Sequence, residues 1–478
     1  MKRTMNDTRT APEITIESFQ VPAICGGSWQ GASQAARFSG AVCDSRQVRS
    51  GNLFVALRGE RTDGHLYLEE AQKRGASLFL VERGHPGLAS LAADSARIEV
   101  TDTGRALLAL AAWHRGKFDI PFVAVTGANG KTTTKEMIAA VLGSRFETFK
   151  TPGNLNSGIG VPLALLDLSD RHEVAVCELG MSSPGEIDRL GALVKPRCAV
   201  FTNIAPVHLT TLHTLEAVAR AKFELLAHLP ADGVAVFCAD DPILRRRAQE
   251  LGERSRTYGL DEQADLRGFD VRLEKDGVRF RVQGGLDVAL PLFGRHNVYN
   301  ALAALTVARI FGVESLEAVA ALAVMEPAAH RSRIVHHGTL TLIDDVYNAN
   351  PRATVSSLES LSGYPARARR VAVLGDMLEL GPDERTWHAE VGRAAAAGAI
   401  DLLVCVGELA GHLAQGAREA GLPGSSVRCY RTAQECAMDI AGWCRADDTV
   451  LLKGSRGAAL ERVLAAVLEH YDLPKEES

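Results

Sequence analysis

The stretch AVTGANGKTTTKEMIAAVL, which begins at Ala124, carries a lysine and small residues at the spacing of a phosphate-binding loop. The usual pattern is G-x-x-x-x-G-K-[ST], but Val125 stands in place of its first glycine, so this loop is shorter. Glycines let backbone N–H groups approach phosphate oxygens, and the following helix N-terminus favours negative charge. In such a loop Lys131 reaches the β- and γ-phosphates and the Thr132 hydroxyl binds Mg²⁺. The alternative is a glycine-rich turn without a ligand, but the strand pattern before it and the helix pattern after it favour a nucleotide site.

A helical pattern in the middle of the chain, TLEAVARAKFELLAHL, places a second lysine on an apolar stripe. Lys222 lies between Val218 and Leu225 on that stripe, where an ammonium must snorkel, pair with an anion or lose its proton. The helix pattern alone favours snorkelling. A neutral amine would instead react with CO₂ to give a carbamate, an anionic oxygen ligand suited to Mg²⁺.

Further candidate ligands follow apolar strands. Glu178 ends the run AVCE, and His208 lies in NIAPVHLTTL just after another strand. Together with Thr132 they make a candidate magnesium shell, although a lone histidine is more often structural. In GRHNVYNALAAL, Asn297 and Asn300 are i, i+3 neighbours on one helix face. Their amides suit an adenine edge, and a helix cap at Asn297 is the alternative.

Near-continuous apolar strands alternate with helical patterns, which is typical of parallel sheets covered on both faces. We expect an α/β protein of three domains: a smaller α/β domain over residues 1–118, a central phosphate-loop domain with a parallel sheet over 119–327, and a C-terminal Rossmann-like domain over 328–478. Ligands of such sheets bind at the carboxyl ends of the strands. Polar residues stand at those predicted ends: Thr126, Glu178, Thr202, Asn203, Asp344, Asp345, Asp376 and Lys453.

Composition limits the partners. A net charge of −5 gives no broad basic field, so nucleic acid and anionic membranes are not expected as main partners. No apolar run is long enough to span a bilayer, and the N-terminus lacks the apolar region of a secretory signal. The 9 cysteines are odd in number and lack C-x-x-C spacing, which indicates free thiols in a reducing cytoplasm.

Seven motifs then occur in a recognisable order: TGANGKTTT, ELGMSSPGEI, TNIAPVHL, AKFE, GRHNVYNALAA, DDVYNANP and LGDMLELG. From about Cys43 to about Arg462 the chain resembles the Mur ligases, which build the peptide stem of bacterial cell-wall precursors. The short phosphate loop is similar to the loop of that family. Within the family, DDVYNANP and VLGDMLELG resemble the enzyme that adds D-alanyl-D-alanine to UDP-N-acetylmuramoyl-tripeptide. Folylpolyglutamate synthases, which are similar, lack the CDSR…GNLFVALRGERTDGH region, which resembles a uridine-nucleotide binding domain.

The resemblance implies roles for the matched residues. The ATP phosphates would be held by Gly127, Ala128, Asn129, Gly130, Lys131, Thr132 and Thr133. One Mg²⁺ would be bound by Thr132 and Glu178, and a second by His208 and a carbamylated Lys222 rather than a snorkelling one. The adenine would face Asn297 and Asn300, while Asp345 and Arg331 (or Arg333) would close over the nucleotide. The UDP-sugar would meet Asp44, Ser45, Arg46, Asn154 and Asn156, and the peptide end Asn348, Asn350, Lys453, Ser455 and Arg456.

The implied reaction forms an amide through an acyl phosphate, with Lys131, His208 and Lys222 as the catalytic groups. The tripeptide carboxylate would attack the γ-phosphoryl group of ATP, and the amine of D-alanyl-D-alanine would then displace phosphate. Two alternatives are a Mur-type ligase of other amino-acid specificity and a phosphate-loop switch, for which the guanine-reading N-K-x-D motif is missing. We expect a cytoplasmic monomer, and the sequence does not distinguish meso-diaminopimelate from lysine in the tripeptide.

Overall fold

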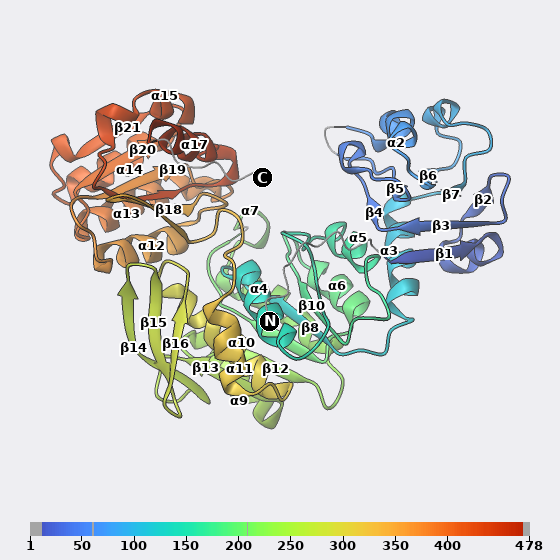
Figure 1. Ribbon diagram of the computed structural model, residues 1–478, viewed down its shortest axis with the longest axis horizontal. Coiled ribbons are helices and arrows are strands. Elements are labelled where there is room, and N and C mark those ends of the chain that lie inside the picture. The colour runs from blue at the N-terminus through green and yellow to red at the C-terminus, as the bar shows by residue number, and fades with distance from the viewer. Residues whose placement is uncertain (1–11, 60–61, 208, 472–478) are drawn as a thin grey trace. The chain divides into compact units, whose positions relative to one another are not determined.

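The structure, a computed structural model, describes residues 12–59, 62–207 and 209–471 (Figure 1). Its contacts divide the chain into two compact units. The first unit comprises residues 1–124, 146–181 and 186–197, and the second comprises residues 125–145, 182–185 and 198–478.

The first unit contains a five-stranded sheet in the order β2-β7-β6-β5-β4, in which β4 to β7 are parallel and β2 is antiparallel. Its strands are β2 (Ser28–Gln30), β4 (Ala41–Val42), β5 (Leu53–Val55), β6 (Leu78–Glu82) and β7 (Arg97–Val100). The unit also holds the antiparallel pair β1 (Glu13–Glu17) and β3 (Ala35–Ser39), and the parallel pair β9 (Thr148–Lys150) and β10 (Val174–Glu178). Its helices are α1 (Val21–Cys25), α2 (Leu68–Lys73), α3 (Thr103–Arg115), α5 (Gly160–Leu165) and α6 (Glu186–Val194). Alternate strand residues belong to different cores, since Leu53 and Leu78 pack with α3 whereas Phe54 and Phe79 pack with α2.

Strand β8 (Phe122–Thr126) leads through the phosphate loop into α4 (Lys131–Gly143) of the second unit. There the strands run β11-β12-β13-β14-β15-β16, parallel from β11 to β14 and antiparallel afterwards. They are β11 (Cys198–Phe201), β12 (Val234–Cys238), β13 (Ser255–Gly259), β14 (Leu266–Glu274), β15 (Gly277–Val282) and β16 (Leu286–Leu290). The helices of this part are α7 (Leu209–Leu212), α8 (Leu215–Phe223), α9 (Pro242–Leu251), α10 (His296–Ile310) and α11 (Ser315–Ala323).

The second unit ends in a six-stranded sheet, the C-terminal sheet, in the order β17-β18-β22-β19-β20-β21. Its strands are β17 (Arg333–His337), β18 (Leu340–Asp345), β19 (Arg370–Gly375), β20 (Leu402–Val406), β21 (Val427–Tyr430) and β22 (Thr449–Lys453); all but β17 are parallel. The helices are α12 (Pro351–Gly363), α13 (Glu384–Ala397), α14 (Ala410–Glu419), α15 (Ala433–Met438), α16 (Ile440–Trp443) and α17 (Glu461–His470). Figure 1 shows α15 and α17 on one face and α12 on the other.

Both faces of the C-terminal sheet are covered by apolar side chains. Ala372 and Leu374 of β19 pack with α12 to α14, whereas Val371 and Val373 pack with α15 to α17. A strand buried on both faces needs an apolar residue at every position, which explains the continuous run RVAVLG. The α/β fold predicted from such runs is confirmed.

One predicted helix is shorter than expected. The pattern TLEAVARAKFELLAHL forms α8 only as far as Phe223, and the chain tightens into a 3₁₀ turn from Glu224 to His228. Such tightening is common at helix C-termini, where i→i+3 bonds satisfy carbonyls that have lost their partners. Lys222 therefore lies in the last turn of α8.

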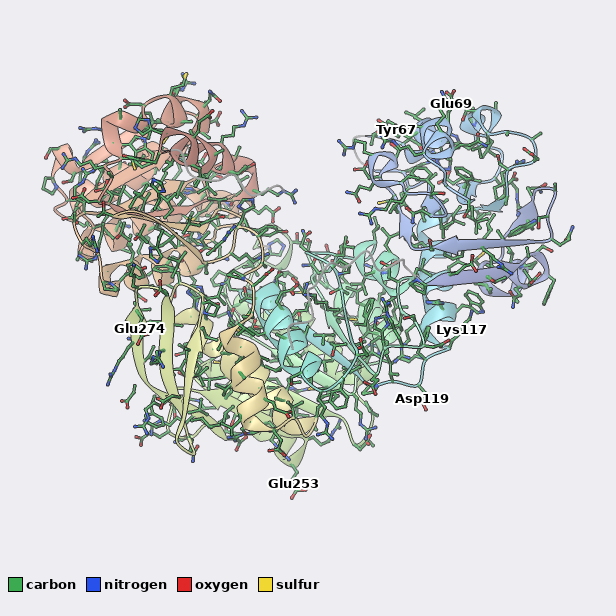
Figure 2. All side chains as sticks on the ribbon, viewed as in Figure 1. Tyr67, Glu69, Lys117, Asp119, Glu253 and Glu274 are labelled. Carbon is green, nitrogen blue, oxygen red and sulfur yellow. The ribbon has the colours of Figure 1, made fainter. Side chains whose placement is uncertain are left out.

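In the part of the chain that the structure describes, no helix is long and apolar enough to cross a membrane. Charged side chains such as Glu253 and Glu274 project away from the ribbon (Figure 2). Both of these residues are exposed.

Candidate active site

The phosphate loop, residues 127–130, is held by the segment that follows β11. The Ala128 N–H donates to the carbonyl of Asn203 at 2.9 Å, and the Asn129 N–H donates to the Asn203 side chain at 3.0 Å. In return the Thr202 hydroxyl donates to the Asn129 carbonyl at 2.7 Å. The first N–H groups of α4 have no partner within the helix, so a loop fixed in this way presents them to an anion.

Two glycines of the loop are required by close packing. Gly127 has a φ of 145°, and a Cβ there would lie 1.9 Å from the Thr202 hydroxyl oxygen. Gly130 has a φ of 79° and precedes α4, and a Cβ there would lie 2.5 Å from the Asn300 amide oxygen. The loop is therefore pressed against β11 on one side and α10 on the other.

Gly127→Ala is expected to abolish detectable nucleotide binding, because the new methyl group would push the loop away from Thr202. Gly143→Ala is the matched control at the other end of α4, since a Cβ there meets nothing within 4 Å. This control should bind nucleotide normally and gain up to about 1 kcal/mol of stability. Calorimetric titration with ATP and thermal unfolding check both variants, and normal binding by Gly127→Ala would contradict the packing argument.

Two lysines converge on one carbonyl of the loop. The amine Nζ of Lys131 lies 3.1 Å from the Gly127 carbonyl, and Nζ of Lys222 lies 2.9 Å from the same oxygen. Lys222 is only 2% exposed, so the snorkelling that the helix pattern favoured is wrong. Burial, and then the charge of Lys131, hold the pKa of Lys222 well below its ordinary range. A lowered pKa favours the neutral amine, which is the nucleophilic form of lysine.

Asn297 and Asn300 form a bridge between α10 and α4. The Asn300 amide donates to the Asn297 side-chain oxygen at 2.9 Å and accepts from the Thr134 hydroxyl at 3.1 Å. Asn297 does not cap α10, since it lies inside the helix and donates to the carbonyl of Phe293 at 2.8 Å. Both side chains are buried and place α10 against the phosphate loop, while their predicted contact with adenine stays a prediction.

Asp345 and Lys453 lie side by side on neighbouring strands of the C-terminal sheet. They are register partners on β18 and β22, and Lys453 Nζ lies 2.6 Å from Asp345 Oδ2. The sequence predicted ATP binding for Asp345 and peptide binding for Lys453, but in this structure the two side chains form an ion pair with each other. Ser455 ties two loops of the same edge together, because its hydroxyl donates to the carbonyl of Ala349 and accepts from the N–H of Leu378.

The two halves of the second unit meet at the loop after β18. The Asn350 side-chain amide donates to the side-chain oxygen of Asn129 in the phosphate loop. Asn350 also caps α12 by accepting from the N–H of Ala353 at 3.0 Å. Next to it, Arg352 donates to the carbonyl of Ile204 at 2.8 Å. Asn350 thus both caps α12 and contacts the phosphate loop directly.

Asn350→Asp is expected to separate these two roles. Aspartate keeps the oxygen that caps α12 but loses the N–H donated to Asn129, so stability should hold while the KM for ATP rises several-fold. Asn350→Ala loses both contacts and should also lose about 1 kcal/mol of stability. Thermal unfolding and steady-state kinetics check this, and equal KM values for ATP in wild type and Asn350→Asp would contradict the bridge.

The remaining predicted residues of the C-terminal part lie close to that edge. The Arg331 guanidinium stacks 3.9 Å from the ring centre of Tyr347, whereas Arg333 lies on β17, so the choice between the two arginines stays open. Arg456 and the Asn348 side chain are exposed. Their contact with a peptide ligand stays a prediction.

Glu178 belongs to the first unit and has one unsatisfied oxygen. Its Oε1 accepts from the Asn156 amide at 2.6 Å, while its Oε2 is buried and has no hydrogen-bond partner among the described residues. A buried carboxylate oxygen without a partner is costly, so this oxygen suits a cation. Asn154, two residues before Asn156, is exposed.

The predicted UDP-sugar residues near the chain start contact one another. Arg46 forms an ion pair with Asp44 at 2.7 Å, and the hydrogen bond from Arg46 lowers the pKa of Asp44. Ser45 is buried and donates to Glu70 at 2.8 Å. The structure therefore brings this trio together without testing the role predicted for it.

A cluster of Asp63, His65 and His85 in the first unit has the composition of a metal site. The His65 Nδ1 lies 2.6 Å from Asp63, and its Nε2 accepts from the N–H of Glu82. The His85 Nε2 faces Asp63 at 3.2 Å, and its Nδ1 accepts from the N–H of Gly87. If a metal bound His65 Nδ1 and His85 Nε2, the ring protons would have to sit on His65 Nε2 and His85 Nδ1, which accept hydrogen bonds in this structure. The cluster is therefore a structural hydrogen-bond network.

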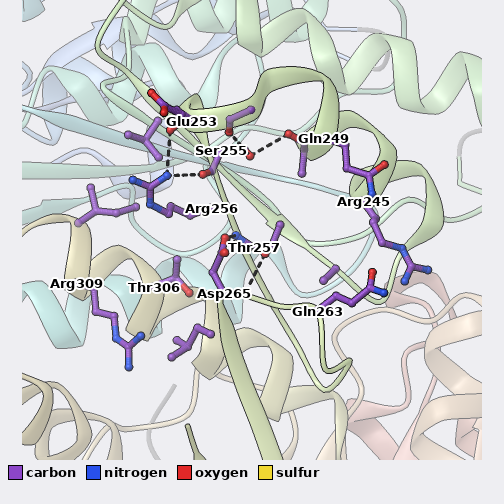
Figure 3. Close-up of a pocket in the computed structure, with 16 residues that line it drawn as sticks. Arg245, Gln249, Glu253, Ser255, Arg256, Thr257, Gln263, Asp265, Thr306 and Arg309 are labelled. Carbon is purple, nitrogen blue, oxygen red and sulfur yellow. Dashed lines mark hydrogen bonds between the residues drawn. The ribbon is translucent and has the colours of Figure 1, made fainter. Parts of the chain in front are cut away.

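A cavity of about 1020 Å³ opens beside α9, β13 and the end of α10 (Figure 3). Arg245 at its wall pairs with Asp261 at 3.2 Å, and Arg256 donates to two backbone carbonyls. None of the predicted site residues lines it. The cavity is therefore separate from the phosphate loop.

Two residues that hold the phosphate loop were assigned no role from the sequence, and one predicted site residue lies outside the described residues. His208 lies outside the described residues. Thr202 and Asn203 were noted as polar strand ends but given no role, although they hold the phosphate loop. Their place in the motif TNIAPVHL was the signal that could have assigned them.

Comparison with known proteins identifies the family. Three descriptions match: Mur ligase family, catalytic domain, over residues 37–115; Mur ligase middle domain over 125–308; and Mur ligase, glutamate ligase domain, over 330–456. The UDP-N-acetylmuramoyl-tripeptide--D-alanyl-D-alanine ligase of Bacillus subtilis (strain 168) is 35% identical over 90% of this chain and 93% of its own length.

Two solved structures have the same fold. MurF from Acinetobacter baumannii superposes with a TM-score of 0.83 at 30% identity, covering 96% of this chain and 100% of that one. MurF ligase from Thermotoga maritima, solved in complex with ADP, gives a TM-score of 0.77 at 29% identity over 90% of this chain and 97% of its own. The chain belongs to the Mur ligase family.

Proposed function

We propose that this ATP-dependent ligase joins D-alanyl-D-alanine to UDP-N-acetylmuramoyl-tripeptide, releasing ADP and phosphate in peptidoglycan precursor synthesis. The observation that carries the proposal is the contact between Asn129 of the phosphate loop and Asn350 of the DDVYNANP loop. It brings the loop suited to ATP next to the loop that carries the motif of this specificity. The similarity to the Bacillus subtilis ligase of that name supports the same reaction.

The chain's own groups suit the first chemical step. A carboxylate is a poor electrophile, so the tripeptide carboxylate first takes the γ-phosphoryl group of ATP and becomes an acyl phosphate. Lys131, held over the Gly127 and Ala128 carbonyls at 3.1 and 3.0 Å, is placed to neutralise charge on the transferred group. The N–H groups at the start of α4 hold the other phosphate oxygens.

Magnesium fits the groups present. The Oε2 of Glu178, buried and without a hydrogen-bond partner among the described residues, suits a cation. Thr132 is a buried hydroxyl at the start of α4, and the amine of buried Lys222 suits carbamylation. We assign Thr132 and Glu178 to one Mg²⁺, and His208 with carbamylated Lys222 to another. When bound, the ions supply positive charge that stabilises the phosphoryl transfer.

The second step needs a site for the dipeptide at the edge of the C-terminal sheet. We assign its carboxylate to Arg456, because Lys453 is already paired with Asp345. Asn348 is exposed on the same edge and offers an uncharged amide for the peptide group. The free amine of the dipeptide then attacks the acyl phosphate carbonyl, and phosphate leaves.

The protein should ligate D-alanyl-D-alanine and refuse single D-alanine by a factor of at least about 10³, because single D-alanine lacks the peptide group assigned to Asn348 and cannot fill both halves of the site. Phosphate release with ATP, the UDP-tripeptide and one amine at a time measures this. Asn348→Ala should raise the KM for the dipeptide more than the KM for ATP. Equal use of single D-alanine would overturn the specificity, and no amine-dependent phosphate release would overturn the ligase itself.

The same assay with tripeptides ending in meso-diaminopimelate and in lysine identifies the natural third residue.

We place the enzyme in the cytoplasm, because its nine cysteines are all free thiols, as a reducing compartment keeps them.

A further inference from the structure

Two cysteines face each other across neighbouring strands of the C-terminal sheet. Cys405 on β20 and Cys429 on β21 are register partners in a parallel ladder. Paired strands lie about 4.8 Å apart, which falls within the Cα separation of about 4.4–6.8 Å that a disulfide needs. Both are free thiols in this structure. The backbone therefore holds the two Cα atoms within the range of separations found in disulfides.

The two thiols differ in access. Cys429 is exposed on the edge strand, whereas Cys405 is buried in the core beneath α14. A hollow of about 370 Å³ adjoins Cys429, between the start of α14 and the end of β21, with Arg431 and Glu408 at its wall. A small molecule can reach Cys429 through this hollow, but not Cys405.

The charges around the pair favour a reactive outer thiol. The neighbouring Cys405 thiol and the positive charge of Arg418 on α14 lower the pKa of Cys429, against partial burial. The same contact, together with burial, raises the pKa of Cys405. Arg431 adds positive charge at the hollow and Glu408 opposes it. Of the two sulfurs, the outer one is therefore the more readily ionised.

A second exposed thiol, Cys43, has the opposite setting. Cys43 is also exposed, but burial of its sulfur and the neighbouring charge of Asp44 raise its pKa. It has no cysteine as a register partner. Cys43 therefore serves as an internal control for thiol reactivity.

We propose that Cys429 and Cys405 form a thiol–disulfide exchange site that takes small-molecule disulfides, with Cys429 as the attacking and Cys405 as the resolving residue. The Cys429 thiolate attacks one sulfur of the disulfide, forming a mixed disulfide and expelling one thiolate, which takes up a proton. Cys405 then loses its proton, attacks the Cys429 sulfur and expels the second thiolate, which is protonated in turn. Two cysteine thiols are oxidised and one external disulfide is reduced to two thiols.

The cysteine pair lies next to the loop between β20 and α14, at the carboxyl ends of the strands of the C-terminal sheet. Gly407, two residues after Cys405, donates its N–H to the carbonyl of Tyr430, next to Cys429. The following N–H groups of Glu408 and Leu409 are held by the Asp376 carboxylate. Oxidation would therefore act at the start of α14 without touching the phosphate loop.

The test uses the full-length reduced protein and oxidised glutathione, followed by acid quenching, alkylation and peptide mass mapping. Wild type should lose two hydrogen atoms and give a linked pair of peptides containing Cys405 and Cys429. Cys405→Ser and Cys405→Ala should instead stop at a mixed disulfide on Cys429, and Cys429→Ser should not react at Cys405. Cys43→Ser should behave like wild type.

At pH 6 Cys429 should react about tenfold faster than Cys43, after the lower nucleophilicity of a weakly basic thiolate is taken into account. Modification of Cys43 as fast as Cys429 would overturn the site. A mixed disulfide that persists in wild type as it does in Cys405→Ser would overturn the resolving role. Because the readout is thiol chemistry, either result is independent of the ligase reaction.

Discussion

Lys131→Ala should lower kcat by about 10³-fold or more while the affinity for the UDP-tripeptide stays nearly unchanged. In the structure Lys131 folds over the loop, with Nζ on the carbonyls of Gly127 and Ala128. Its charge is most valuable when negative charge spreads over the transferred phosphoryl group, so its loss costs more in the transition state than in binding. The sugar nucleotide is assigned to other residues, in the first unit.

Single-turnover phosphate release and calorimetric binding of the UDP-tripeptide separate these two effects. Lys73→Ala is the control for loss of a lysine, because Lys73 is exposed and pairs with Glu69 one helical turn away. Its activity should equal that of wild type. If Lys131→Ala kept activity within tenfold of wild type, the assigned role would be wrong.

The fold could be predicted from local patterns because strands buried on both faces of a parallel sheet have nearly continuous apolar sequences. The strands read as LTLIDD, RRVAVLGDM and LLVCVGE are β18, β19 and β20. The end of α8 was misplaced because apolar spacing continues through Leu225, which stays buried in the 3₁₀ turn. Burial of a side chain does not reveal whether the backbone closes i→i+4 or i→i+3 bonds.

The site was predicted less completely because its contacts join distant parts of the chain. The pattern around Lys222 could not show that its partner is Gly127, 95 residues away. Asp345 and Lys453 were assigned to different ligands because their pairing depends on β18 lying beside β22 in the sheet. That strand order is a property of the tertiary structure, and neither strand's sequence specifies it.

The second large effect is expected at Lys222. Lys222→Ala should lower kcat by about 10³-fold, because one Mg²⁺ would lose its carbamate ligand and the charge stabilisation it supplies. Formate or acetate in the buffer should restore part of the activity, since a small carboxylate offers the same two oxygens as a carbamate in the space that the side chain leaves. Lys222→Arg should stay inactive with or without these acids, because a guanidinium cannot be carbamylated and fills the space with positive charge.

¹³C NMR with labelled bicarbonate provides a readout that does not depend on turnover. Wild type should show one carbamate signal that is missing from folded Lys222→Arg. Lys135 is the internal control, because it is equally buried but forms an ion pair with Glu136 at 2.8 Å. A signal that survives in Lys222→Arg would place the carbamate elsewhere, and a fully active Lys222→Arg would show that the reaction needs no carbamate. Lys222 combines burial against the carbonyl of Gly127 and a lowered pKa with a position at the phosphate loop, which is what a carbamate at this site requires.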